Sequence, residues 1–92
     1  MTATEQWRVS AEYDHSAFDR LKRALTSLGY SIVPKLYGVA GSQEVSTYEA
    51  TNASGVVTVE SETYIGLTVA GAAMALYELK LRYDELSGSK LP

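Results

Sequence analysis

Few side chains in this sequence could carry out catalysis. His15 is the only histidine and there is no cysteine, so a nucleophile would have to be a serine or threonine activated by His15. Glu60 and Glu62 lie two residues apart on a predicted strand and would both face solvent. Such a pair lacks the burial on which acid–base catalysis by carboxyl groups depends. We therefore expect no catalytic site and no enzyme activity.

Metal and cofactor sites are not expected either. A single histidine cannot build a His-based metal site within one chain, and the absence of cysteine removes thiolate ligands. The run Gly38-Val39-Ala40-Gly41-Ser42 has neither the spacing nor the lysine of a phosphate-binding loop. The sequence therefore predicts no metal and no cofactor.

The length and composition leave room for one domain. The chain has 92 residues, of which 46% are hydrophobic, which suffices for one packed core. We expect a single α+β domain over residues 1–92, with frayed ends at 1–5 and 88–92. The start of the chain lacks the features of a secretory signal, and no apolar run approaches the roughly 18 residues of a membrane span. A cytoplasmic protein without membrane contact is expected.

The first third of the chain predicts a strand followed by a helix. Residues 6–13 alternate between apolar and polar side chains, which is typical of a half-buried strand. Ser16 and Asp19 resemble a capping box at the start of a helix. Gly29 is expected to end this helix, and Tyr30 to close it in a Schellman motif. Four apolar residues recur at spacings of three and four on one face of the helix: Phe18, Leu21, Leu25 and Leu28.

The middle of the chain predicts four further strands. Pro34 places the first of them at a sheet edge or a bend, and a flexible connection is expected over 38–42. Residues 52–55 have turn chemistry, and a hairpin turn is expected near Ser61-Glu62. The four predicted strands are 30–37, 44–51, 56–60 and 63–69. The residues expected on the inner face of the last two are Val57, Val59, Ile65, Leu67 and Val69.

A second helix is predicted over residues 70–86. The element order is then β-α-β-β-β-β-α, which favours an α+β fold with an antiparallel sheet of four to five strands and both helices packed on one face. One stripe of this helix should face the sheet: Ala72, Ala75, Leu76, Leu79, Tyr83 and Leu86.

The second helix also carries apolar residues on the opposite side. Met74, Tyr77 and Leu81 fall together almost directly opposite the sheet-facing stripe. They could pack against the first helix or remain as ordinary exposed residues. Alternatively they form an interface, either a homodimer seam or a partner-binding face, because methionine and tyrosine are enriched at such surfaces.

Two other surfaces are candidates for partner binding. Glu49, Glu60, Glu62 and Tyr64 are expected to cluster on the outer face of the sheet. This acidic face is either a solvated surface or a docking site for a basic partner. Exposed tyrosines are good binding groups, and four of the seven are expected to be exposed: Tyr37, Tyr48, Tyr64 and Tyr77.

Nucleic-acid binding is the main alternative. Arg20, Lys22 and Arg23 on the first helix could contact phosphates. The order α-β-β-β-α resembles that of double-stranded-RNA-binding domains. However, the last helix begins with the run 70–74, Ala-Gly-Ala-Ala-Met, which lacks the phosphate-gripping lysines of that family. Nucleic acid is therefore the less favoured partner.

The expected function is that of a small non-enzymatic interaction protein. We expect it to bind a larger protein or complex and to block or modulate it, in addition to forming a homodimer if the second helix supplies a seam. Short, acidic, cysteine-free chains are common among phage and mobile-element proteins, including inhibitors of host defence such as anti-CRISPR proteins. This is an expectation from composition, and no motif in the sequence identifies such a family.

Overall fold

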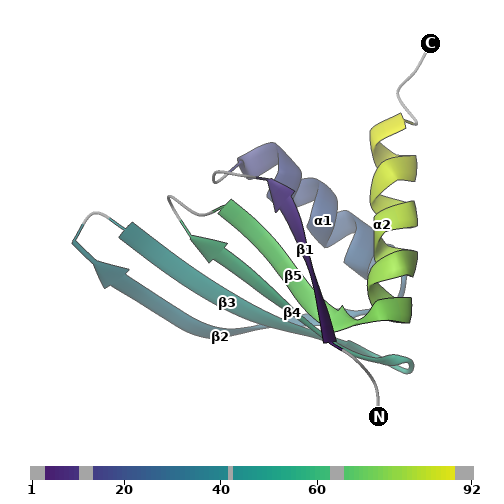
Figure 1. The fold of residues 1–92 in the computed structure, drawn as a ribbon, viewed down its shortest axis with the longest axis horizontal. Coiled ribbons are helices and arrows are strands. Elements are labelled where there is room, and N and C mark those ends of the chain that lie inside the picture. The colour runs from purple at the N-terminus through teal and green to yellow at the C-terminus, as the bar shows by residue number, and fades with distance from the viewer. Residues whose placement is uncertain (1–3, 11–13, 42, 63–65, 89–92) are drawn as a thin grey trace.

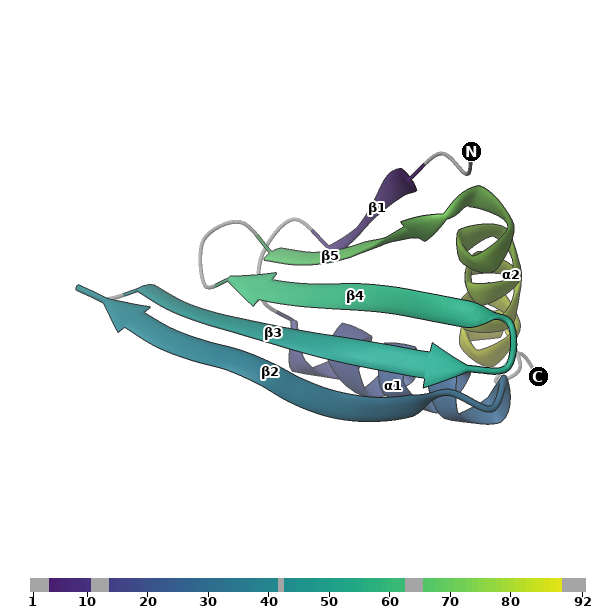
Figure 2. The same ribbon diagram turned by 90° about the horizontal axis from the view of Figure 1, so that it is seen from below.

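The computed structural model describes residues 4–10, 14–41, 43–62 and 66–88, and it confirms the expected α+β fold and element order (Figure 1). Five strands form one antiparallel sheet in the order β1-β5-β4-β3-β2, so β1 and β2 are its two edges. Both helices pack on one face (Figure 2). The elements are β1 (Thr4–Ser10), α1 (His15–Ser27), β2 (Ser31–Ala40), β3 (Gln43–Asn52), β4 (Gly55–Glu62), β5 (Gly66–Ala72) and α2 (Ala73–Gly88).

Helix α1 begins two residues earlier than the predicted capping box implies. Asp14 is the N-cap, and its Oδ1 accepts hydrogen bonds from the backbone N–H groups of Ser16 at 3.0 Å and Ala17 at 3.2 Å. The prediction of Ser16 and Asp19 as a capping box is therefore wrong. Aspartate and serine are equally good N-cap residues. Of two such candidates, the one nearer to the first apolar residue of the helix is not always the cap.

The end of α1 is the predicted Schellman motif. The N–H of Tyr30 donates to the carbonyl of Leu25, and the N–H of Gly29 donates to that of Thr26, each at 3.0 Å. Gly29 has a φ of 87°, a left-handed conformation that a side chain disfavours. These bonds satisfy carbonyls at the helix end and direct the chain into β2.

Strand β2 is longer than predicted and forms an edge. Pro34 lies on this edge strand, as expected, and the register with β3 shifts between Pro34 and Leu36. Residues 38–40 were expected in a flexible connection but continue β2, because Gly38 and Val39 pair with Val45 and Glu44. The resulting β2–β3 hairpin extends past β4 and α1 (Figure 2).

Two boundaries around β5 also differ from the prediction. Ser61 and Glu62 are not a turn but the last residues of β4, paired with Leu67 and Gly66. The predicted helix start at 70 is wrong as well, because residues 70–72 belong to β5 and pair with residues 4–6 of β1. In both places hydrogen bonding to a neighbouring strand outweighs weak local preferences. The predicted inward residue Ile65 lies outside the described residues.

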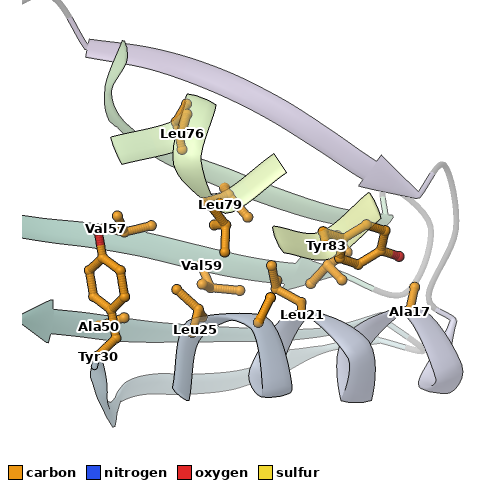
Figure 3. Packing of buried hydrophobic residues seen from close by; sticks show 13 residues of the cluster. Ala17, Leu21, Leu25, Tyr30, Ala50, Val57, Val59, Leu76, Leu79 and Tyr83 are labelled. Atoms are coloured by element: carbon orange, nitrogen blue, oxygen red, sulfur yellow. The ribbon is translucent and has the colours of Figure 1, made fainter. Parts of the chain in front are cut away.

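The core fills the space between the two helices and one face of the sheet. Leu21 and Leu25 of α1, Leu79 of α2, and Val57 and Val59 of β4 converge there (Figure 3), and each is at most 1% exposed. Leu67 and Val69 of β5 are also buried in this cluster, as predicted. Within the described part of the chain, neither helix is long and apolar enough to cross a membrane.

Candidate protein-binding surface

Helix α2 has two apolar sides, as the sequence predicts. Its inner side packs on the sheet and on α1 through three buried residues, Leu76, Leu79 and Tyr83. The ring of Tyr83 meets the ring of Trp7 edge to face at 5.3 Å, which ties α2 to β1. One predicted member of the inner stripe, Ala72, is instead the last residue of β5.

The outer side of α2 faces away from the rest of the chain. Its apolar residues are Met74, Tyr77 and Leu81, which are 72%, 61% and 50% exposed. We call these three residues the α2 outer face. Their exposure rules out the alternative in which this stripe packs against the first helix, and whether the face binds a partner stays a prediction.

Helix α1 meets α2 on a different side. The Nη1 of Arg82 donates to the Oγ of Ser27 at 2.8 Å. The guanidinium of Arg20 lies over the ring of Tyr83, 4.9 Å from its centre. These contacts fix the rotation of α2 about its axis, and they leave the α2 outer face pointing outward.

A surface hollow of about 350 Å³ borders the α2 outer face. Glu5 and Gln6 of β1 line one wall, and Met74, Tyr77 and Lys80 of α2 line the other. The ammonium of Lys80 lies 5.9 Å from the centre of the Trp7 ring. The hollow thus combines several apolar side chains with one acid and one base. It is large enough to receive a side chain of a partner protein.

The predicted acidic residues do share the outer face of the sheet. Glu49 lies opposite Thr58, and Glu60 and Glu62 follow at alternate positions along β4. Their charge is partly offset, since Lys35 Nζ lies 3.9 Å from a Glu49 oxygen. Tyr64, the fourth predicted member of this face, lies outside the described residues.

The predicted basic cluster does not form one surface. Arg20 points toward α2, where it lies over Tyr83, whereas Lys22 lies over the ring of Phe18 and 3.8 Å from an Asp19 oxygen. Lys22 and Arg23 both line an open depression of about 630 Å³ on the exposed side of α1, together with Asp19. Only two of the three cations therefore share a surface, and the carboxylate of Asp19 offsets part of their charge, which does not favour a strong phosphate site.

Edge strand β2 carries four exposed apolar residues that were not predicted as a group. All four are more than half exposed: Val33, Leu36, Tyr37 and Val39. Val33 and Leu36 lie on the outer face of the sheet, whereas Tyr37 and Val39 lie on the face that the helices cover. The exposure of Tyr37 was predicted, but the strand was expected to end there. The absence of any charged residue between Lys35 and Glu44 is the signal that could have revealed the last three.

Two further tyrosines, Tyr30 and Tyr48, lie wholly or partly inside the fold. Tyr48 was expected to be exposed, but it is partly buried against Phe18, with ring centres 5.4 Å apart. Burial raises the pKa of Tyr30 above its usual value near 10, and the negative charge of Glu78 raises this pKa further. Among the described residues, no group of three His, Asp or Glu side chains could hold a metal ion.

One His–Asp pair is present on α1. The Nε2 of His15 lies 3.4 Å from Oδ2 of Asp19, one helical turn away, and both side chains are exposed. This arrangement is an ordinary contact between neighbouring side chains on an exposed helix face. No protein-family model, curated protein or solved structure matches this chain. A functional interpretation must therefore rest on the surfaces described above.

Proposed function

We propose that this chain is a non-enzymatic interaction protein that binds a larger cytoplasmic protein or complex through the α2 outer face and blocks or modulates it. The observation that carries the proposal is the exposure of Met74, Tyr77 and Leu81 on a helix whose other side already fills the core. Three large apolar side chains on one helix face, at spacings of three and four, form the kind of stripe that docks into a hydrophobic groove.

The energetics of this face suit a binding hot spot. Covering an apolar side chain that is half exposed or more contributes about 1–2 kcal/mol. Three such side chains next to a hollow can supply much of the affinity of an interface, because a few central residues usually dominate binding. The hollow beside Met74 and Tyr77 gives the partner a place to insert an anchor of its own.

The acidic outer face of the sheet would be a secondary contact. If the partner is basic there, Glu49, Glu60 and Glu62 would speed its association. The affinity would then fall as the salt concentration rises, because these carboxylates are exposed to screening. Affinity that is independent of salt would remove the acidic face from the proposal and leave the α2 outer face unaffected.

The composition suggests which class of protein to test first. Inhibitors encoded by phages and mobile elements, such as anti-CRISPR proteins, act by occupying a surface on a larger complex, and many are short, acidic chains. The nucleic-acid alternative is less favoured, because Arg20 points toward α2, away from Lys22 and Arg23, and Asp19 lies beside these two. A gel-shift titration at low salt tests this alternative directly: tight binding that Arg23→Glu abolishes would replace our proposal.

The proposal is tested by affinity capture from the source cell with quantitative mass spectrometry. We expect a specific protein to be captured by the wild type and lost with Tyr77→Glu or Leu81→Glu. Thr26→Glu is the matched control, because it adds the same charge to the exposed side of α1. Circular dichroism of each variant verifies the fold. Equal capture by all variants, or loss only with Thr26→Glu, would contradict the proposal.

A further inference from the structure

Edge strand β2 is less protected against pairing than edge strand β1. β1 has seven residues, including the charged Glu5 and Arg8. β2 has ten residues with one charge, Lys35, and one proline, Pro34. Charges and proline are the usual devices that keep an edge strand from pairing with another chain. Both devices of β2 lie in its first half.

The second half of β2, Leu36–Ala40, is uncharged and regular. Past the register shift, Leu36 to Ala40 pair with β3 without interruption. Tyr37 lies opposite Ser46, which lies opposite the buried Ser61, so the Tyr37 side chain is on the helix-covered face of the sheet. It is nevertheless 62% exposed, because the hairpin extends beyond the helices (Figure 2). We call Leu36–Ala40 the open edge segment.

We propose that the open edge segment pairs antiparallel with the same segment of a second copy, so that two five-stranded sheets join into one across a twofold axis at Gly38. In this register Tyr37 of each copy lies opposite Val39 of the other, on the same face of the sheet. Pairs of an aromatic and a β-branched residue are among the favourable cross-strand pairs. In the same register Leu36 lies opposite position 40 of the second copy, and Gly38 lies opposite Gly38.

The charge distribution favours a second copy in this register. The only charge on β2, Lys35, lies opposite Gly41 of the second copy and not opposite the second Lys35. Registers centred nearer the start of β2 would bring the two lysines, the two prolines and both register shifts into the seam. The symmetric contact is self-complementary and closes after two chains, as in most small homo-oligomers.

The size of the seam sets the strength of the dimer. Five residues from each chain bury less than the roughly 800 Å² per partner of a standard stable interface. We therefore expect a weak, reversible dimer with a Kd on the order of 100 µM. Helix α2 packs near β1, β5 and β4, whereas β2 is the opposite edge of the sheet, so the α2 outer face stays free in this dimer. The dimer and the proposed function can therefore fail independently.

Disulfide trapping tests the register. The chain has no cysteine, and Gly38 accepts one because a Cβ there would meet no atom within 4 Å. Opposite residues of an antiparallel pair have Cα atoms about 4.5–5.5 Å apart, within the range of a disulfide. In the same dimer the two Leu36 positions are four residues out of register, about 13 Å apart.

Under mild oxidation we expect Gly38→Cys to form a covalent dimer at least about tenfold faster than Leu36→Cys, since only the former brings two sulfurs within bonding distance. Sedimentation equilibrium of the uncrosslinked protein supplies the second readout. Tyr37→Lys should abolish dimerisation, whereas Tyr77→Lys, at a tyrosine of equal exposure, should leave it unchanged. Equal crosslinking of both cysteine variants, a monomeric wild type at millimolar concentration, or a dimer broken only by Tyr77→Lys would overturn the inference.

Discussion

The two helices lie on the same face of one sheet but present different surfaces to solvent. α1 buries Leu21 and Leu25, and its exposed side is charged, with Lys22 and Arg23 among its residues. α2 buries Leu79 in the same way. Its exposed side carries the α2 outer face instead, consisting of Met74, Tyr77 and Leu81.

The difference separates what the fold requires from what it does not. A helix that covers one face of a sheet needs one apolar stripe. Helix α1 has this stripe and no large apolar residue among its exposed side chains. The second stripe of α2 adds no buried area to the monomer. Single exposed apolar residues are ordinary in proteins, whereas three on one helix face are the basis of the proposed binding surface.

The largest expected effect compares two leucines of α2. Leu79→Ala removes a fully buried side chain and should lower the free energy of unfolding by about 2–5 kcal/mol. Leu81→Ala removes one that is half exposed, and it should change stability by less than about 0.5 kcal/mol. Urea denaturation of both variants measures the contrast. A large loss with Leu81→Ala would mean that the outer stripe supports the fold after all.

A smaller effect is expected at the start of α1. Asp14→Ala removes the cap that binds two backbone N–H groups and should cost about 1 kcal/mol. Ser16→Ala should cost less than about 0.5 kcal/mol, because Ser16 is an exposed residue of the first turn. The same denaturation measurement applies. If Ser16→Ala proved the more damaging of the two, Ser16 would be the cap and the assignment of Asp14 would be wrong.

The smallest effect is a pH dependence at Tyr30, which lies between the end of α1 and Glu78 of α2. Its pKa is raised in the folded chain, mainly by burial. Above pH 10 the unfolded chain therefore loses this proton first, and stability should decline as the pH rises toward the folded pKa. Below pH 10 this group contributes no pH dependence. Urea denaturation between pH 9 and 11 measures this decline in stability. Tyr30→Phe should remove the decline, whereas the control Tyr77→Phe should leave it unchanged. If the decline persisted in Tyr30→Phe, another group would be its cause.

The fold was predictable where one strong pattern acts alone. The spacing of Leu21, Leu25 and Leu28 predicts α1, and the positive φ required at Gly29 predicts its end. The alternation of Val57 and Val59 predicts β4 and its inner face. These patterns depend only on the period of a helix or a strand.

The errors fall where small residues leave the local preference weak. Residues 70–72, Ala-Gly-Ala, suit the start of a helix, but pairing with β1 keeps them in β5. Residues 38–40, Gly-Val-Ala, also have a weak local preference and were predicted to be a flexible connection. Pairing with β3 places them in strand β2. The candidate sites followed the same division. Helical spacing alone predicts the α2 outer face, whereas the exposed apolar residues at the end of β2 depend on pairing with β3 that extends the strand beyond residue 37.

The central claim is that the α2 outer face is the binding surface. Calorimetric titration with the partner that affinity capture identifies, after its purification, tests this claim most directly. We expect Tyr77→Ala to weaken binding by at least about tenfold, equivalent to about 1.4 kcal/mol, with Thr26→Ala on α1 indistinguishable from the wild type. If Tyr77→Ala and Leu81→Ala both bound the partner with wild-type affinity, the claim would be contradicted.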